Sequence, residues 1–309
     1  MHLAGFACRT PCLYCPHLAF AFTLDLKMQP HPPPSFQDHW IATPEGRLFA
    51  RRWTPAAAAP APDHAPAPAL GPSPAAPAAA PIVLLHDSLG CVELWRDFAP
   101  QLAQATGRDV VAYDRLGFGR SDPHPGRLAL DFIHSEAHGG FAALCRQLHL
   151  AHCALLGHSV GGAMAAVCAA EFPAICQALV TESAQAFVEE RTLSGIAQAR
   201  DAFARPGELQ RLHKYHGDKA PWVLDAWVGT WLHPDFRHWS LDTVLAQVQC
   251  PVLALHGAND EYGSAQQPQR FASLPAGPAT LQLLPGCGHV PHREQSAAML
   301  QAVQDFLAP

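Results

Sequence analysis

The pattern of hydrophobic and polar positions predicts short strands that alternate with helices. Mostly apolar runs bounded by turn residues are typical of strands covered on both faces of a sheet. Such runs occupy residues 82–85, 153–156, 178–181, 251–257 and 280–284. A helix of small residues is predicted over 162–167, directly after the second of these strands. Strands and helices in this order indicate an α/β architecture with a largely parallel sheet.

The chain before these strands changes composition twice. Residues 41–53 are predicted to form a hairpin that turns at residues 43–46. Residues 55–81 are almost entirely Ala and Pro, so we expect a stiff, exposed insertion without a catalytic role. Residues 1–35 are expected to be a poorly ordered extension. Its apolar run 18–24 is followed by charged residues instead of a signal-peptide cleavage site, and Met28 is an alternative start.

Between the third and fourth of these apolar runs, over residues 183–248, the strand pattern gives way to helices. The helical segment divides the predicted core into a first part, residues 36–182, and a second part, residues 249–309. It also carries Trp222, Trp227 and Trp231, which pack in the core or line an apolar pocket. Helices are predicted over 192–203, 208–215 and 221–231, the last with Pro in its first turn.

A G-x-S-x-G motif at residues 157–161 is the strongest chemical signal in the sequence. It follows a predicted strand and precedes a predicted helix, which places Ser159 on a tight strand-to-helix turn. Flanking glycines let the neighbouring backbone approach closely and push the serine hydroxyl out above the sheet. A serine hydroxyl is a weak nucleophile at neutral pH, so catalysis also requires a base and an orienting acid.

An acid and a base follow in the order Ser, Asp, His. Asp260 lies just past one strand and His289 just past the next, and ligands bind at the carboxyl edge of an open parallel sheet. Glu182, which ends the strand over 178–181, is an alternative acid. His292 is an alternative base, because the chain has 19 histidines and proximity alone is a weak criterion. His158 and His86 are interpreted as packed, hydrogen-bonded residues.

These motifs together resemble the α/β-hydrolase superfamily over residues 36–309. The resemblance implies a mostly parallel, doubly wound sheet with a helical cap inserted after the sixth strand. It also implies an oxyanion hole formed by the backbone N–H groups of Ser88 and Val160. The loop at residues 86–90 reads His-Asp-Ser-Leu-Gly, with Asp87 where the family usually has glycine. The segment 113–122 resembles a structural loop of the family.

The resemblance implies a serine-hydrolase mechanism without a metal or an organic cofactor. Ser159 would attack a carbonyl group while His289 accepts its proton, and Asp260 would hold the His289 imidazole in the useful tautomer. The expected reaction is the hydrolysis of a small carboxylic ester or a related acyl substrate. Alternatives are carbon–carbon bond hydrolysis of the aromatic-catabolism type and acyl transfer. A ligand sensor on the same fold, without turnover, is the alternative from a different class.

Composition and charge fit a globular enzyme. Apolar residues make up 49% and charged residues 15% of the chain, and the net charge is −6. We therefore expect no nucleic-acid partner, and no apolar run approaches the roughly 18 residues of a membrane span. The sequence leaves the oligomeric state open.

The ten cysteines are interpreted as unpaired thiols. Cys8, Cys12 and Cys15 match a spacing that holds iron–sulfur clusters, but no companion glycine motif follows them. The others are scattered through predicted strands and helices, as small buried thiols are. This pattern indicates a reducing compartment, and we expect a cytoplasmic location.

Overall fold

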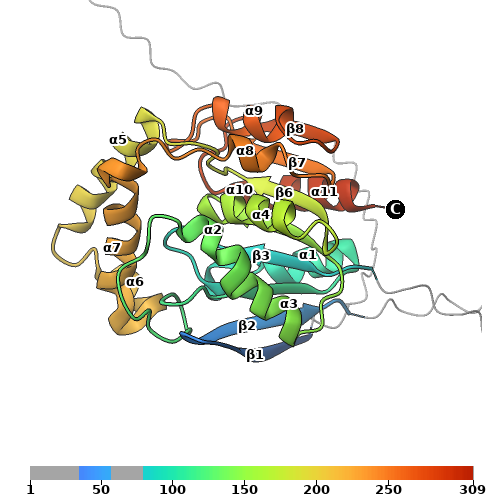
Figure 1. The fold of residues 1–309 in the computed structure, drawn as a ribbon, viewed down its shortest axis with the longest axis horizontal. Coiled ribbons are helices and arrows are strands. Elements are labelled where there is room, and N and C mark those ends of the chain that lie inside the picture. The colour runs from blue at the N-terminus through green and yellow to red at the C-terminus, as the bar shows by residue number, and fades with distance from the viewer. Residues whose placement is uncertain (1–34, 57–78, 309) are drawn as a thin grey trace, which may run out of the picture. The chain divides into compact units, whose positions relative to one another are not determined.

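The computed structural model describes residues 35–56 and 79–308, which form an eight-stranded sheet with helices on both faces (Figure 1). The strands are β1 (Ser35–Thr43), β2 (Gly46–Thr54), β3 (Ile82–Leu85), β4 (Val110–Tyr113), β5 (Cys153–His158), β6 (Cys176–Glu182), β7 (Val252–Gly257) and β8 (Ala279–Leu284). The predicted extension, most of the Ala/Pro segment, Met28 and the three N-terminal cysteines lie outside the described residues.

The helices alternate with the strands along the chain after β3. They are α1 (Phe98–Thr106), α2 (Phe132–Glu136), α3 (Ala142–Gln147), α4 (Val160–Glu171), α5 (Glu190–Phe203), α6 (Gln210–His216), α7 (Ala220–Trp231), α8 (Asp242–Leu245), α9 (Gln266–Ser273), α10 (Pro291–Glu294) and α11 (Ser296–Leu307). A single π-helical turn, Ala137–Phe141, joins α2 to α3.

The sheet has the strand order β1-β2-β4-β3-β5-β6-β7-β8. β1 pairs antiparallel with β2, and β2 pairs antiparallel with β4, whereas all the other pairs are parallel. The predicted hairpin is present, and Thr43 faces Gly46 across its turn. The predicted α/β class with a mostly parallel sheet is confirmed.

Two apolar cores cover the two faces of the sheet. Successive strand side chains point to opposite faces, so in β3 Val83 and Leu85 enter one core while Ile82 and Leu84 enter the other. The first core includes α2, α4, α8 and α9, and the second includes α1 and α11. Burial on both faces explains why β3, β5, β6 and β7 read as apolar runs, whereas β8, the last strand of the sheet, is partly exposed.

The parallel strands bring six loops to one edge of the sheet. The carboxyl ends of β3, β4, β5, β6, β7 and β8 all lie there, because neighbouring parallel strands run in the same direction. The helices α5, α6 and α7 lie between β6 and β7 in the chain, within a residue or two of their predicted bounds. They group together beside the sheet (Figure 1).

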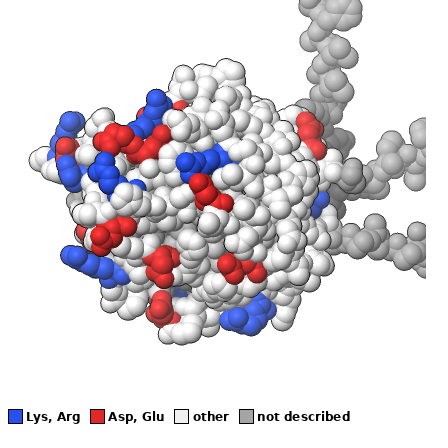
Figure 2. All heavy atoms as spheres, turned by 45° about the horizontal axis from the view of Figure 1, so that its top comes forward, with Lys and Arg blue, Asp and Glu red and all other residues white. Residues whose placement is uncertain are grey.

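Surface properties of the described part are those of an ordinary folded domain. Basic and acidic side chains are interspersed on the face drawn in Figure 2 and form no continuous stripe of one sign there. Within residues 35–56 and 79–308, every helix is too short or too polar to cross a bilayer. The seven cysteines in these ranges are free thiols.

Candidate active site

Ser159 occupies a strained turn between β5 and α4. Its φ of 58° and ψ of −127° lie in a region that non-glycine residues rarely adopt, and such strain is concentrated at functional sites. The turn closes only because its neighbours are glycines. A Cβ atom on Gly157 would overlap the carbonyl oxygen of Gly161, and one on Gly161 would overlap the carbonyl oxygen of Leu85. The elbow predicted from the motif is therefore present.

The structure brings the three predicted catalytic side chains together in one hydrogen-bonded line. His289 Nε2 lies 3.1 Å from Ser159 Oγ, and His289 Nδ1 lies 2.9 Å from both carboxylate oxygens of Asp260. Because a carboxylate only accepts hydrogen bonds, Nδ1 carries a proton, and Nε2 of the neutral ring is free to accept the Ser159 proton. This is the arrangement that activates a serine hydroxyl.

Asp260 is held as a buried, ionised carboxylate. Burial acts to raise its pKa, but the hydrogen bond and charge of His289 outweigh burial and lower the pKa below its ordinary value. Its Oδ1 also accepts the N–H groups of Tyr262 and Gly263, which fixes the carboxylate within its own loop.

The alternative acid and the alternative base form a separate pair. Glu182 Oε1 accepts both the backbone N–H of His292, at 2.6 Å, and its ring Nδ1, at 2.8 Å. Both side chains are buried, with exposed fractions of 0% and 3%. Glu182 therefore orients His292, and Asp260 orients His289.

The two predicted oxyanion donors lie at the same edge of the sheet. Ser88 is in the turn after β3, in which the N–H groups of Leu89 and Gly90 donate to Asp87. Among the described residues, the N–H of Ser88 has no acceptor. Val160 begins α4, and the first N–H groups of a helix have no partner within it. Both groups are thus available to an oxyanion.

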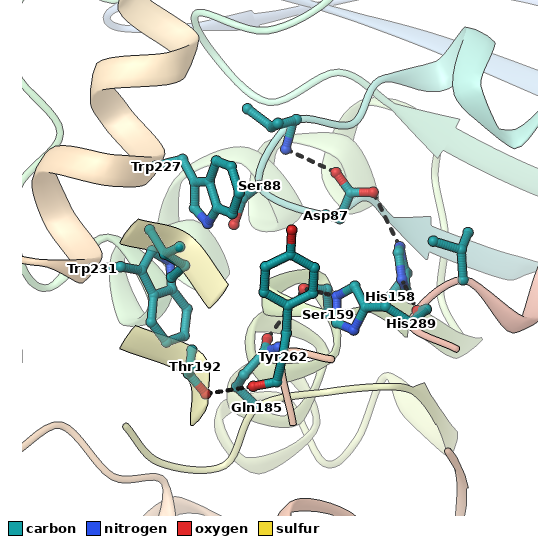
Figure 3. A pocket seen from close by; sticks show the side chains of 13 residues that line it. Asp87, Ser88, His158, Ser159, Gln185, Thr192, Trp227, Trp231, Tyr262 and His289 are labelled. Carbon is teal, nitrogen blue, oxygen red and sulfur yellow. Dashed lines mark hydrogen bonds and ion pairs between the residues drawn. The ribbon is translucent and has the colours of Figure 1, made fainter. Parts of the chain in front are cut away.

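A cavity of about 150 Å³ opens onto Ser159. Figure 3 shows Trp227, Trp231 and Tyr262 facing it, with Ser159 and His289 at its base. The other side chains around it come from the loops after β3 and β6, from α5 and from the loop after β8. The lining consists of Asp87, Ser88, Leu89, His158, Ser159, Gln185, Thr192, Ile196, Trp227, Trp231, Tyr262, His289 and Val290.

The structure places Trp222 outside this cavity, which corrects the prediction for that residue. Its indole N–H donates to the carbonyl oxygen of Gly126 at 2.7 Å, and its ring stacks on His124. On α7, Trp227 and Trp231 are four residues apart and share a face, whereas a five-residue separation turns Trp222 about 140° away from Trp227.

Several lining residues carry no motif that singles them out in the sequence. Gln185 Oε1 lies 3.2 Å from Ser159 Oγ and competes with His289 for its single proton. Tyr262 contacts the His289 ring, at 4.8 Å between centroids, and its backbone oxygen accepts the Thr192 hydroxyl proton. Gln185 and Tyr262 both lie shortly after the carboxyl end of a strand. This position is the one feature of the sequence that could have indicated them as site residues.

Two buried histidines beside the site differ in charge. His158 Nδ1 faces Asp87 Oδ2 at 3.1 Å, and its Nε2 faces the carbonyl oxygen of His289 at 2.8 Å. Since both partners only accept, both ring nitrogens donate and the ring is an imidazolium. His86 instead donates to Asp87 O and accepts the N–H of Arg115, so it is neutral. Burial, with the nearby Arg115 charge, lowers the pKa of His86 well below its ordinary value.

The charge of His158 predicts a loss of stability at alkaline pH. Burial alone would lower its pKa, but Glu182 and Asp87 raise it from 6.5 to about 9. Folding therefore binds a proton, and this contribution is present below pH 6.5 and lost as pH rises through about 9. Urea unfolding of wild type and His158→Gln across this range measures it. The difference in unfolding free energy should shrink with pH, and a constant difference contradicts the assignment.

A doubly covered, mostly parallel sheet with a serine elbow and a Ser-His-Asp line at its carboxyl edge defines the α/β-hydrolase fold. A sequence model of the family described as "alpha/beta hydrolase fold" matches residues 80–217. Residues 80–217 thus match this family, the described part of the chain has the α/β-hydrolase fold, and the curated relatives below are hydrolases.

Three curated relatives are hydrolases. The human serine hydrolase BPHL is 29% identical over 58% of this chain and 62% of that protein. The 2-hydroxy-6-oxo-2,4-heptadienoate hydrolase of Pseudomonas putida is 28% identical over 74% of this chain and 89% of that protein. The sn-1-specific diacylglycerol lipase ABHD11 of Danio rerio is 36% identical, over 32% of this chain and 30% of that protein. The chain thus spans less than two thirds of the first and third of these relatives.

Solved structures agree on the fold. The crystal structure of a hydrolase from Pseudomonas aeruginosa superposes with a TM-score of 0.64, over 88% of this chain and 99% of that chain, at 20% sequence identity.

Within the described ranges, no three His, Cys, Asp or Glu side chains are grouped so that they could hold a metal ion.

Proposed function

We propose that the protein is a serine hydrolase that cleaves small, uncharged carboxylic esters through an acyl-enzyme on Ser159. The observation that carries this proposal is the continuous line from Asp260 through His289 to Ser159, which ends at a cavity. Hydrogen-bond distances at both ends of the imidazole are those that proton transfer requires.

The proposed reaction proceeds in two halves. Ser159 Oγ bonds to the ester carbonyl carbon as His289 Nε2 takes the hydroxyl proton, and the N–H groups of Ser88 and Val160 bind the oxyanion. The carbon–oxygen bond to the alcohol then breaks, and His289 returns the proton to that alcohol. Water repeats the sequence on the acyl-enzyme and releases the acid. Asp260 stabilises the His289 imidazolium in both halves.

The cavity favours an uncharged acyl group of modest size. Its upper wall is formed by aromatic and aliphatic side chains, among them Leu89, Ile196 and Trp231. In the described part of the chain, neither Lys nor Arg lines the cavity, and the positive charge of His158 is already paired with Asp87. A substrate carboxylate would therefore lack a cation to bind. We further propose that α5–α7 act as a cap that supplies this apolar wall.

Carbon–carbon bond hydrolysis is the second candidate, because the dienoate hydrolase aligns over 89% of its length. A p-nitrophenyl ester series of increasing acyl length, combined with labelling by a fluorophosphonate probe, separates the two. Labelling at Ser159 with fast turnover of a short or medium ester supports the proposal. Labelling without ester turnover favours carbon–carbon hydrolysis, acyl transfer or sensing, and the absence of labelling in folded protein contradicts a working serine nucleophile.

Shortening Trp227 to alanine is expected to move the preferred acyl length upward. The ring forms one wall of the cavity and is half-buried, so its removal creates room without emptying the core. Each methylene that fits a pocket contributes about tenfold in kcat/KM, so the variant should favour a longer ester by at least about that factor. Trp222→Ala, on the same helix but outside the cavity, is the matched control. An unchanged optimum in Trp227→Ala would show that this wall does not bind the acyl chain.

A further inference from the structure

The carboxylate of Asp87 links the oxyanion loop to the nucleophile elbow. Its Oδ1 accepts the N–H of Leu89 at 2.8 Å, and its Oδ2 accepts the Nδ1 proton of His158 at 3.1 Å. Leu89 directly follows Ser88, and His158 directly precedes Ser159. One side chain therefore sets the position of the proposed oxyanion donor relative to the nucleophile.

His158 extends this link to the loop that carries the catalytic base. Its Nε2–H donates to the backbone oxygen of His289 at 2.8 Å, and its ring is 2% exposed. The series of contacts Leu89–Asp87–His158–His289 thus joins the loops after β3 and β8 to the end of β5. Figure 3 shows Asp87 and His158 beside Ser159 and His289, and the side chains of Asp87 and His158 take no part in the Ser159–His289 hydrogen bond.

The backbone of Asp87 is fixed as well. Its carbonyl oxygen accepts a proton from Arg115 Nη2 at 2.9 Å and another from His86 Nδ1 at 2.8 Å. The carbonyl oxygen of Leu89 accepts from His216 Nε2 on α6 at 3.0 Å. The oxyanion loop is consequently held at the two positions that flank Ser88, and the Asp87 side chain hydrogen-bonds this loop to the elbow at His158.

We propose that Asp87 and His158 form a partly buried carboxylate–imidazolium pair that positions the Ser88 N–H and His289 for catalysis at Ser159. Both are positioning residues, and the inference rests on the proposed hydrolase function. The pair explains an aspartate in a tight turn of the oxyanion loop, where a charge so close to a developing oxyanion would otherwise be unfavourable. Its charge is neutralised by the adjacent imidazolium, which leaves the N–H groups free to act.

Asp87→Asn separates the charge of the pair from its hydrogen bonds. The amide oxygen can still accept from Leu89, and the amide N–H can donate to a neutral His158, whose Nε2–H still reaches the His289 carbonyl. When His158 gains a second proton, its Nδ1–H faces the amide N–H and the link breaks. Asp87→Ala removes the link at every pH.

The groups that face His158 set the pH range of this test. Asp87 on the oxyanion loop and Glu182 on β6 favour its charged form, whereas the rings of His289 and His292 lie 5.1 Å from it between centroids. The ratio of wild-type to variant kcat removes the pH effects that are common to both proteins. We expect this ratio for Asp87→Asn to be near one at pH 8.5 and to rise as pH falls below 7.

The measurements are kcat and KM on the best p-nitrophenyl ester, the rate of fluorophosphonate labelling, and imidazole ¹⁵N spectra. Asp87→Ala should lower kcat and the labelling rate about 10- to 100-fold with little change in KM, since misplacement of reacting groups by about 1 Å costs that much. The His158 signals, assigned by their loss in His158→Gln, should show two protonated nitrogens at pH 7 in wild type and one at pH 8.5 in Asp87→Asn.

The matched control is Asp109→Ala. Asp109 has a similar side-chain exposure, 22% against 26%, and pairs with Arg52 at the opposite edge of the sheet. Wild-type kcat in Asp87→Ala, a pH-independent ratio for Asp87→Asn, or a neutral His158 in wild type would each overturn the inference. If wild type neither labels nor hydrolyses any ester, the proposed function fails, while the spectra still test the pair.

Discussion

Ser159→Ala is expected to lower kcat for ester hydrolysis by about a millionfold, the scale seen when the nucleophile of a serine triad is removed. Without Oγ no acyl-enzyme forms, and the neutral His289 has no proton to accept from residue 159. The protein should remain folded, because alanine occupies the same backbone conformation at φ 58° with a smaller side chain. Labelling by the fluorophosphonate probe should disappear together with turnover.

The matched control for this variant is Ser183→Ala. Ser183 is also buried, also has a positive φ, of 46°, and follows β6 at the same edge of the sheet, yet its hydroxyl has no hydrogen-bond partner among the described residues. It should keep wild-type labelling and turnover. Full activity in Ser159→Ala would refute the nucleophile assignment, and equal losses in both variants would point to a folding defect in place of a chemical one.

The second large effect is expected for Asp260→Asn, with a loss of about ten-thousandfold in kcat. The amide keeps the size of the carboxylate and an oxygen for the N–H groups of Tyr262 and Gly263, so the loop should hold its shape. Its N–H₂ group, however, turns His289 into the tautomer whose Nε2 carries a proton and cannot accept the one from Ser159. Stopped assays at saturating ester give kcat directly.

Glu182→Gln is the comparison that decides between the two acids. Glu182 bonds His292 and not His289, so this variant should keep kcat within about tenfold and lose roughly 1–3 kcal/mol of stability from its weakened buried contacts. A collapse of kcat in Glu182→Gln with a mild effect in Asp260→Asn would reverse the assignment.

The sequence alone was sufficient for the features that depend on local pattern. The elbow, the hairpin and the strands around Ser159, Asp260 and His289 could be predicted because turn glycines and apolar runs act within a few residues. The meeting of Ser159, Asp260 and His289 at one edge also followed, since the carboxyl ends of parallel strands lie at the same edge of a sheet.

Features that depend on which side chains meet across the fold could not be predicted. The sequence marked Asp87 only as a departure from the family's glycine, and its partner His158 is 71 residues away. That Gln185 and Tyr262 line the cavity could be known only from the positions of their loops in the fold. That Trp222 lies outside the cavity could be known only from the orientation of α7 about its own axis. These are long-range contacts, which no local pattern encodes.

The Ala/Pro segment enters and leaves the described fold on the side remote from catalysis. Ala56 follows β2 and donates its N–H to Gln104 on α1, and Ala79 leads into the amino end of β3. Ser159 lies beyond the carboxyl end of β5, which runs parallel to β3. A surface-attachment tag placed between these two points would anchor the enzyme with its substrate entrance facing away from the support, so immobilised protein should retain access for bulky esters.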